Sequence, residues 1–429
     1  MYAINEKLTE RARAGNPIRV GLIGVGQMGS EIIAQVGEME GMEITAAVDL
    51  TAEQVKQGLA SSRKRRPQAV TDDTEKARQA VDAGKTVVST DYRVVTSLPQ
   101  IEVVIDATGS PEMGAVISME CINHKKNIVM MNVECDVTIG PIIRQMADNA
   151  GVVYSLAAGD EPAAIIEIYR FARAMGFEVV AAGKGKNNPL DVYATPAQWE
   201  AKARERKMNA RMLVEFVDGS KTMVEMAAVS NATGLVPDRR GMHGPKAMVD
   251  ELAEVFCPAS QGGILSRSGC VDFSIGNVAP GIFVIVTTDN QRIKDGLAQR
   301  DMGPGPNYLL YRPYHLCSVE VPLTAAQTVL YRESSGHPKA GLVSECIAVA
   351  KRAIKAGEVL DGIGETCYHG SVDLASTARE ENLLPLGLAK GMAASRDIPK
   401  DTAISWDMVD VVNESVLLQL RRIQDRLFG

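Results

Sequence analysis

The stretch at residues 18–29, IRVGLIGVGQMG, constrains the fold of this chain more than any other. Its apolar first half predicts a β-strand, and Gly24, Gly26 and Gly29 follow in the pattern G-x-G-x-x-G. Residues 31–39 can continue as a helix. In such strand–turn–helix units the first glycine permits a tight turn, the second lets a pyrophosphate approach the backbone, and the third lets the helix pack on the strand. Free N–H groups at the helix start then suit phosphate.

A second apolar run, at residues 42–48, ends in Asp49. This is about twenty residues beyond the last glycine, where a carboxylate binds the ribose of a dinucleotide. The alternative is a glycine turn that serves helix packing and binds nothing. Because the turn, the spacing and the acidic residue agree, we predict a dinucleotide-binding unit. Its predicted cofactor-binding residues are Gly24, Gly26, Gln27, Met28, Gly29 and Asp49.

The type of cofactor depends on a basic segment at residues 61–67, SSRKRRP. The segment could be a solvated surface loop, or it could bind the 2′-phosphate of NADP, since cations just past the second strand have that role in such folds. Asp49 argues for NAD instead. Four adjacent cations favour NADP(H), with Arg63 as the predicted contact.

Further apolar runs at residues 101–107, 127–132 and 152–156 alternate with helical segments. This alternation predicts an α/β fold with a Rossmann-type, doubly wound parallel sheet. Ligands of such sheets lie beyond the carboxyl ends of the strands. An ordinary turn and a helix cap are equally good alternatives for the polar residues there. The residues predicted to line the cofactor crevice are Thr108, Gly109, Asn132 and Glu134.

Composition narrows the class of protein. The chain has 429 residues, of which 45% are hydrophobic and 23% charged, which suits a globular protein of two or three domains. A net charge of −7 gives no general affinity for nucleic acid or anionic membranes. Seven scattered cysteines without C-x-x-C spacing predict reduced thiols and no structural zinc. With no apolar leader and no run long enough to span a membrane, we expect a cytoplasmic protein.

The pattern changes twice along the chain. Residues 1–162 form the predicted dinucleotide-binding domain, and residues 163–335 a mixed α+β domain with many polar loops. Residues 336–429 form a small β-rich domain with a weak internal repeat, KRAIKAGEVL at 351–360 and SRDIPKDTAI at 395–404. A binding role and a packing role for this last domain are both open.

Two lysines separated by one glycine, Lys184 and Lys186, are the leading catalytic candidates. They fall in a predicted loop at residues 183–189, followed by the amide of Asn187. Mutual repulsion should lower the pKa of one lysine into a useful range for proton transfer. The alternative is a solvated cationic turn.

Two more groups could contribute to chemistry. Asp218, Lys221 and Glu225 surround a segment that could equally be a hairpin turn with exposed charges. Further along, Arg312 could grip a phosphate or carboxylate with two hydrogen bonds, and two neighbours add donors. These neighbours are Tyr314 and His315, although a single histidine is more often structural.

Several motifs together resemble one family: IGVGQMG (23–29), GDEP (159–162), GKGKNNP (183–189), DGSKTMVEMA (218–227) and the C-terminal repeat. The chain resembles the homoserine-dehydrogenase-like oxidoreductases that carry a C-terminal SAF domain. Within them it looks most like the 1-deoxy-D-xylulose 5-phosphate reductoisomerase-like subgroup. One departure is Asp401, which stands where a glycine usually turns the SAF chain.

The resemblance implies an NADPH-dependent enzyme that rearranges and reduces the sugar phosphate 1-deoxy-D-xylulose 5-phosphate to 2-C-methyl-D-erythritol 4-phosphate, for isoprenoid precursors. It also implies a divalent cation (Mg²⁺ or Mn²⁺) and a homodimer formed through the middle domain. By resemblance Lys184, Lys186 and Asn187 handle substrate and protons, while Arg312 and Tyr314 bind phosphate. No spacing singles out the metal ligands among the available carboxylates, which are Asp160, Glu161, Asp218 and Glu225.

Two other functions stay open on the sequence. One is homoserine dehydrogenase, or a related oxidoreductase that acts on a small hydroxy acid. The other is a non-catalytic cofactor sensor whose C-terminal domain binds a carbohydrate or a partner. Turnover assays separate the three.

Overall fold

A computed structural model describes residues 3–428. Its largest sheet has seven parallel strands in the order β3-β4-β2-β1-β5-β6-β7. Two βαβ halves therefore meet at the β1–β5 pair, which is the doubly wound arrangement predicted from the sequence. The strands are β1 (Ile18–Ile23), β2 (Met42–Val48), β3 (Gln68–Val70), β4 (Thr86–Ser89), β5 (Val103–Asp106), β6 (Asn127–Met130) and β7 (Tyr154–Leu156).

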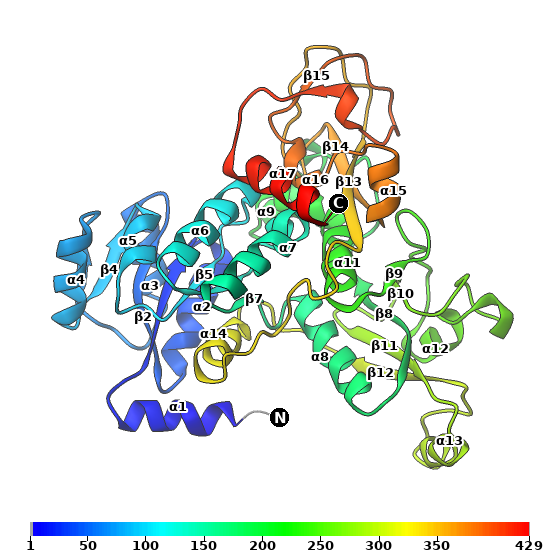
Figure 1. Cartoon of the computed structure of the whole chain (residues 1–429), viewed down its shortest axis with the longest axis horizontal. Coiled ribbons are helices and arrows are strands. Elements are labelled where there is room, and N and C mark those ends of the chain that lie inside the picture. The colour runs from blue at the N-terminus through cyan, green and yellow to red at the C-terminus, as the bar shows by residue number, and fades with distance from the viewer. Residues whose placement is uncertain (1–2, 429) are drawn as a thin grey trace.

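Helices cover both faces of this sheet (Figure 1). Its central strands are buried on both sides, which explains why they read as continuous apolar runs rather than alternating ones. The helices of this part are α1 (Ile4–Arg13), α2 (Gln27–Glu38), α3 (Ala52–Leu59), α4 (Thr74–Asp82), α5 (Tyr92–Ser97), α6 (Pro111–Asn123) and α7 (Val133–Ala150).

The middle of the chain forms a mixed five-stranded sheet in the order β12-β11-β8-β10-β9. The central strand β8 is parallel to β10 and antiparallel to β11. Helices α8 (Glu161–Ala174) and α11 (Ser220–Thr233) pack against it. The strands are β8 (Glu178–Lys186), β9 (Val236–Pro237), β10 (Cys270–Ile275), β11 (Ile282–Thr287) and β12 (Asn307–Arg312), and the other helices are α9 (Pro196–Glu205), α10 (Ala210–Val217), α12 (Leu252–Val255), α13 (Gln291–Ala298) and α14 (Val321–Leu330).

In this region the structure contradicts one sequence-based prediction and excludes one alternative. The predicted loop at 183–189 is strand β8 as far as Lys186, because its small residues tolerate the close neighbouring backbones. The hairpin considered at 218–220 is instead the junction between α10 and α11. Gly219 takes a φ of 85° there, which lets the chain turn from one helix directly into the next.

The C-terminal part is a small β-rich unit above the other two (Figure 1). The two halves of its repeat pair with each other at equivalent positions, since Ile354 and Ile398 exchange backbone hydrogen bonds of 2.9 and 2.8 Å. Asp401, which replaces the usual glycine, adopts a φ of 65°. Its elements are β13 (Ser344–Ala350), β14 (Tyr368–Leu374), β15 (Ala393–Ala394), β16 (Val409–Asp410), α15 (Ala375–Glu380), α16 (Leu386–Ala389) and α17 (Val416–Phe428).

Two helices connect the parts. Helix α14 follows the middle sheet in sequence but packs on β5 and β6, and α17 packs on α6 and α7. Pro141 inside α7 blocks regular helical bonding, and Gln424 of α17 compensates by bonding the Ile142 N–H (3.2 Å) and the Thr138 carbonyl (3.1 Å). The domain ranges inferred from the sequence stay a prediction.

All seven cysteines are free thiols, as the sequence predicted. Within residues 3–428, no helix is both long and apolar enough to cross a membrane.

Candidate active site

The three glycines after β1 have the distinct environments that the motif requires. Gly24 takes a φ of 95°, and a Cβ there would lie 2.6 Å from the Ala107 carbonyl oxygen. A Cβ on Gly29 would lie 2.0 Å from the Gly24 oxygen, so α2 can approach the turn only with glycine. A Cβ on Gly26 would meet nothing within 4 Å. The turn and packing roles of Gly24 and Gly29 are confirmed, and Gly26 faces open space where a pyrophosphate fits.

Helix α2 begins without a side-chain cap, so the N–H groups of its first turn, which contains Gln27 and Met28, are available to phosphate. Asp49, at the end of β2, lies against the same turn. Its carboxylate accepts hydrogen bonds from the Val25 and Leu50 N–H groups, each 2.6 Å long. This geometry fits the predicted contact with ribose.

The predicted 2′-phosphate contact through Arg63 is wrong. Arg63 pairs with Glu38 (3.1 Å), and Lys64 donates to the carbonyls of Val36 and Met42 (3.2 and 3.0 Å). These partners lie at the end of α2 and the start of β2. Helix α3 has carried the chain to the amino edge of the sheet, opposite the glycine turn, so these cations cannot reach the cofactor.

The loops after β5 and β6 complete the carboxyl edge. Thr108 donates from its N–H (2.9 Å) and hydroxyl (2.7 Å) to Asp106, and Gly109 turns there with a φ of 62° and open space beside it. Asn132 caps α7 by accepting from the Cys135 N–H (3.2 Å), while its amide donates to the Ser110 carbonyl (2.6 Å). Asn132 is therefore the helix cap that the sequence offered as an alternative, and its amide also holds the loop after β5 in place.

Strand β8 points both candidate lysines to one side. Lys184 and Lys186 are two residues apart and therefore face the same way. The intervening Gly185 faces the other way, where a Cβ would lie 2.1 Å from the Ala279 nitrogen. Both lysine residues are only 5% exposed, so the solvated-turn alternative is excluded.

The lysines join a buried group of charges from several segments. The Lys184 ammonium lies 2.5 Å from Glu161 Oε1 at the start of α8, and it also contacts Glu225 of α11. His315 Nε2 is 3.4 Å from the same Glu161 oxygen, and the His315 Nδ1 lies 3.0 Å from the Gly159 carbonyl. Buried charges are tolerated only when they are paired in this way.

A second ion pair links this group to the large sheet. Lys221, one helical turn before Glu225 on α11, lies 2.8 Å from Glu134 in the first turn of α7. Glu134 follows β6, and Asp160 follows β7. The buried charges therefore lie beyond the carboxyl ends of these strands, on the edge that carries the cofactor crevice. We call Glu134, Asp160, Glu161, Lys184, Lys186, Lys221, Glu225 and His315 the charged cluster.

Burial tunes the proton affinities within the charged cluster. It raises the pKa of Asp160 to about 7 and that of Glu225 to about 8. Burial and the nearby Lys184 charge lower the pKa of Lys186 to about 8. Burial alone would lower the pKa of Lys184, but Glu161 and Glu225 outweigh it and raise that pKa. Lys186 is therefore the lysine suited to exchange a proton near neutral pH.

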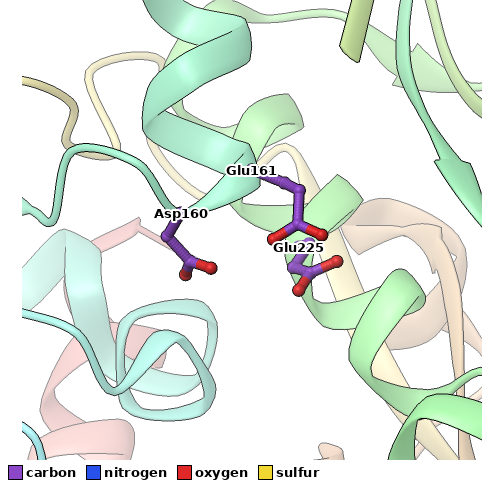
Figure 2. A group of neighbouring side chains, drawn as sticks. All are labelled: Asp160, Glu161 and Glu225. Carbon is purple, nitrogen blue, oxygen red and sulfur yellow. The ribbon is translucent and has the colours of Figure 1, made fainter. Parts of the chain in front are cut away.

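Three carboxylates of the cluster could hold a cation. Asp160, Glu161 and Glu225 each have an oxygen within 4.8 Å of the others. Figure 2 shows them converging from the start of α8 and from α11. Lys184 contacts one oxygen of Glu161 and one of Glu225, but Glu225 Oε1 is buried without a hydrogen-bond partner in the described chain. An all-oxygen set with a free acceptor fits Mg²⁺ or Mn²⁺.

Several predicted catalytic residues lie outside the charged cluster. Asp218 pairs with Lys351 of the C-terminal part (2.7 Å), and Asn187 is exposed. Arg312 pairs with Glu320 and Glu167, and its guanidinium lies 4.7 Å from the ring centre of Tyr314, so Arg312 is engaged, whereas Tyr314 is exposed. Ion pairs engage Asp218 and Arg312 away from the charged cluster, whereas Asn187 and Tyr314 are exposed.

Sequence reasoning also missed some contacts of the charged residues. The carboxylate of Glu134, which was predicted to line the cofactor crevice, pairs with Lys221, and its contact with the cofactor stays a prediction. Lys351 was not predicted at all, because a lysine in a repeat motif gives no signal of burial. Asp160 and Glu161 had one signal, since they directly follow the last strand of a Rossmann-type sheet.

Three protein-family models match successive parts of the chain. Residues 18–157 match "Dihydrodipicolinate reductase, N-terminus", residues 159–321 match "Oxidoreductase DRL, catalytic domain", and residues 347–410 match "SAF domain". Each match covers less than half of the chain, and together with the fold they support a Rossmann-type domain, an oxidoreductase-type catalytic domain and a SAF domain. The predicted Rossmann-type fold and SAF domain are thus confirmed, while the activity of the whole protein and the reductoisomerase-like subgroup stay predictions.

Individual relatives are more distant. A homoserine dehydrogenase from Synechocystis sp. is 26% identical over 142 residues, which cover 33% of this chain and 29% of that enzyme. A solved "probable dehydrogenase" from Thermotoga maritima is 12% identical with a TM-score of 0.41, over 74% of this chain and 90% of that one. An NAD binding oxidoreductase from Klebsiella pneumoniae is 13% identical with a TM-score of 0.33, over 71% and 67%. With both TM-scores below 0.5, neither structure supports a conclusion about this chain.

Proposed function

We propose that the charged cluster is the active site of an NAD(P)-dependent oxidoreductase for a small hydroxy acid, such as homoserine. One observation carries this proposal: lysines and carboxylates from separate segments converge at the carboxyl edge of the dinucleotide-binding sheet. A nicotinamide enzyme needs from its protein a bound cofactor, a held substrate and a group that moves one proton. The charged cluster would hold the substrate and supply the group that moves the proton.

Lys186 is the proposed proton-transfer residue. Its Nζ donates to the Phe216 carbonyl (2.5 Å), and no salt-bridge partner of this ammonium occurs in the described chain. A lysine with a pKa of about 8 is partly neutral near pH 8 and can accept the hydroxyl proton as hydride leaves the same carbon. A bound oxidised nicotinamide would supply the hydride acceptor, and Lys186 would take the hydroxyl proton, so that the alcohol becomes a carbonyl.

Substrate binding is proposed for the cations at the open side of the cluster. Lys221 retains 18% exposure of its side chain, more than Lys184 with 7%. Its ammonium can therefore contact a substrate carboxylate while it stays paired with Glu134. Lys184 stays between its two carboxylates, and its positive charge helps to lower the pKa of Lys186.

A second candidate is the reductoisomerase that converts 1-deoxy-D-xylulose 5-phosphate. The carboxylate trio favours it, because a divalent cation held by Asp160, Glu161 and Glu225 would polarise the adjacent oxygens of that sugar phosphate. Against it, Arg312, one of the two phosphate candidates, is already paired with Glu320 and lies over the ring of the other, Tyr314. The hydroxy-acid dehydrogenase is therefore the first choice.

The cofactor preference follows from the position of the basic segment. The sequence favoured NADP(H) through Arg63, but that side chain lies at the opposite edge of the sheet. Asp49 lies against the glycine turn, and in the proposed ribose contact its charge would repel a 2′-phosphate. We therefore propose NAD(H) as the preferred cofactor. A homodimer formed through the middle domain is a further proposal, which sedimentation would test.

The deciding experiment is a turnover panel with the purified full chain. Homoserine and other hydroxy acids are assayed with NAD⁺ and NADP⁺, and 1-deoxy-D-xylulose 5-phosphate with NADH and NADPH, with and without Mg²⁺ or Mn²⁺. We expect NAD⁺ reduction by a hydroxy acid and its loss in Lys186→Met. Turnover of the sugar phosphate alone would establish the second candidate. Cofactor binding without turnover, unchanged by Lys186→Met, would establish a non-catalytic sensor.

A further inference from the structure

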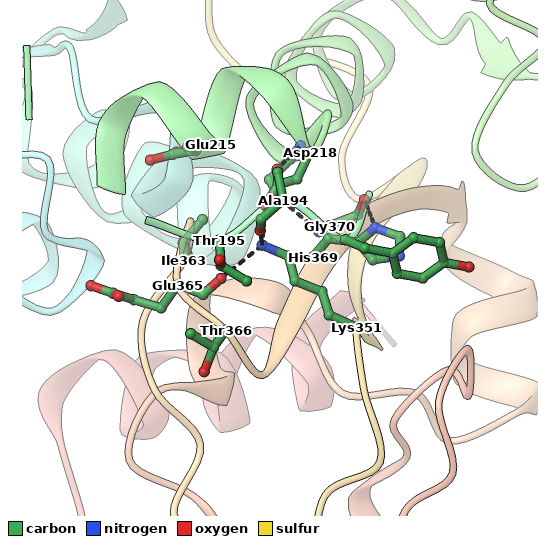
Figure 3. A network of polar contacts seen from close by, with 12 residues as sticks. Ala194, Thr195, Glu215, Asp218, Lys351, Ile363, Glu365, Thr366, His369 and Gly370 are labelled. Atoms are coloured by element: carbon green, nitrogen blue, oxygen red, sulfur yellow. Dashed lines mark hydrogen bonds and ion pairs between the residues drawn. The ribbon is translucent and has the colours of Figure 1, made fainter. Parts of the chain in front are cut away.

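Lys351 carries a charge from the SAF domain into the catalytic domain. It directly follows β13, and its side chain is only 2% exposed. The ammonium lies 2.7 Å from Asp218 Oδ2 and donates to the carbonyls of Ala194 (2.9 Å) and Glu365 (2.8 Å), as Figure 3 shows. One carboxylate oxygen and two carbonyl oxygens therefore surround the ammonium, which makes burial of the charge tolerable.

Strand β14 of the SAF domain contacts the same turn, which contains Asp218 and Ser220. The Gly370 N–H of β14 donates to the Ser220 hydroxyl (2.8 Å), and Asp218 accepts from the Ser220 N–H (2.8 Å). A Cβ on Gly370 would lie 3.3 Å from the Ser220 Cα, so this contact is close. Two SAF strands thus hold the turn between α10 and α11, which we call the 216–221 turn.

The 216–221 turn bears directly on the charged cluster. At its first residue, the Phe216 carbonyl accepts the hydrogen bond of Lys186. At its last, Lys221 reaches Glu134, and one helical turn later Glu225 reaches Lys184. A shift of this turn would therefore move Lys221 itself together with the partners of Lys186 and Lys184.

We propose that the SAF domain completes the active site by fixing the 216–221 turn, with Lys351 as the positioning residue. Lys351 touches none of the reacting groups and acts through Asp218 and the Ala194 carbonyl. This gives the SAF domain a role inside the enzyme, where the sequence left binding and packing open. The inference rests on the proposed function only for its turnover measurement.

The test compares Lys351→Met with a matched control. Lys355→Met removes another SAF lysine, whose pair with Asp397 (2.7 Å) is exposed on both sides. Since Lys351→Met leaves the Asp218 carboxylate buried and unpaired, a double variant, Asp218→Asn with Lys351→Met, removes both charges and protects folding. Each protein is measured for kcat and KM, for the dissociation constant of NADH, and for hydrogen exchange.

We expect Lys351→Met to lower kcat at least about tenfold, because small displacements of catalytic groups are costly. Its NADH affinity should stay within about twofold of wild type, since the glycine turn is remote. Exchange should rise in residues 214–226 and stay unchanged in residues 24–38. The double variant should fold more stably than Lys351→Met but keep most of the kcat loss, because the Ala194 and Glu365 carbonyls still lack their donor. Lys355→Met should match wild type.

Other outcomes would overturn the inference. Unchanged kcat in both folded Lys351 variants would exclude the positioning role. A rise of hydrogen exchange across the whole chain, with a parallel loss of NADH binding, would exclude it as well. If the wild-type protein turns over no substrate, the proposed function fails by itself. The exchange pattern then still decides, because only a rise confined to residues 214–226 supports the SAF contact.

Discussion

Replacing Gly26 with alanine should strongly weaken cofactor binding without unfolding the protein, whereas the same change at Gly29 should destabilise the fold. The two residues belong to one motif and differ by three positions. A Cβ on Gly26 would meet no heavy atom within 4 Å, while a Cβ on Gly29 would lie 2.0 Å from a backbone oxygen. The pair thus separates binding from packing within a single turn.

The magnitudes follow from these surroundings. Gly26 has a φ of −71°, which alanine adopts easily, and the loss of unfolded-state entropy stabilises by about 0.4–1 kcal/mol. Alanine is a poorer N-cap than glycine, which costs a similar amount. The free energy of unfolding should therefore change by less than about 1 kcal/mol. For Gly29→Ala, the backbone must shift, at a cost of about 1–3 kcal/mol or more.

The added methyl of Gly26→Ala occupies the space where the pyrophosphate fits, so NADH affinity should fall at least about a hundredfold, or about 2.7 kcal/mol. Fluorescence titration with NADH and urea unfolding at the same pH measure the two quantities. NADH binding within about threefold of wild type would refute the placement of the pyrophosphate over Gly26. A Gly26→Ala protein less stable than Gly29→Ala would refute the packing argument.

Three further changes test the charged cluster and the cofactor preference. Lys184→Met leaves Glu161 and Glu225 buried without their ammonium, so the free energy of unfolding should fall by about 3–5 kcal/mol. Urea unfolding at pH 8 measures this loss, and a loss below about 1 kcal/mol would contradict the buried ion pairs. Burial raises the pKa of Glu225 to about 8, above its unfolded value, so its contribution to stability is present at low pH and is lost as pH rises toward 8. The stability of wild type relative to Glu225→Gln should then fall by up to about 1.4 kcal/mol per pH unit between pH 5 and 8, whereas a flat difference would show an ordinary pKa. Arg63→Ala should leave the affinities for NADH and NADPH within about twofold of wild type, and a selective loss of NADPH binding would restore the 2′-phosphate contact.

The sequence could predict the dinucleotide-binding unit because its constraints are local. The roles of Gly24 and Gly29 depend on backbone geometry within a few residues, and Asp49 follows at the spacing that one βαβ unit imposes. The apolar runs located the parallel strands for the same reason, since burial on both faces leaves a continuous signal. Spacing also indicated that one of Lys184 and Lys186 would have a lowered pKa, which holds for Lys186.

The sequence could not predict which charges would meet. Arg63 follows the second strand closely in sequence, yet α3 carries it to the far edge of the sheet, where Glu38 pairs with it. Arg312 had the right chemistry for phosphate, but it is paired with Glu320. Composition and spacing indicate which interactions a side chain can make. They do not indicate which partner tertiary packing places beside it.

By itself, then, the sequence determined the Rossmann-type unit and the candidate lysines, while the bounds of the three expected domains stay a prediction. Only the tertiary structure brought Glu134, Glu161 and Glu225 to those lysines, and only it placed Lys351 of the SAF domain beneath Asp218. The physical reason is that burial of an ion pair depends on how helices and sheets pack. Lys351 and Asp218 are far apart in the chain, and docking of the SAF strands on the 216–221 turn makes them neighbours.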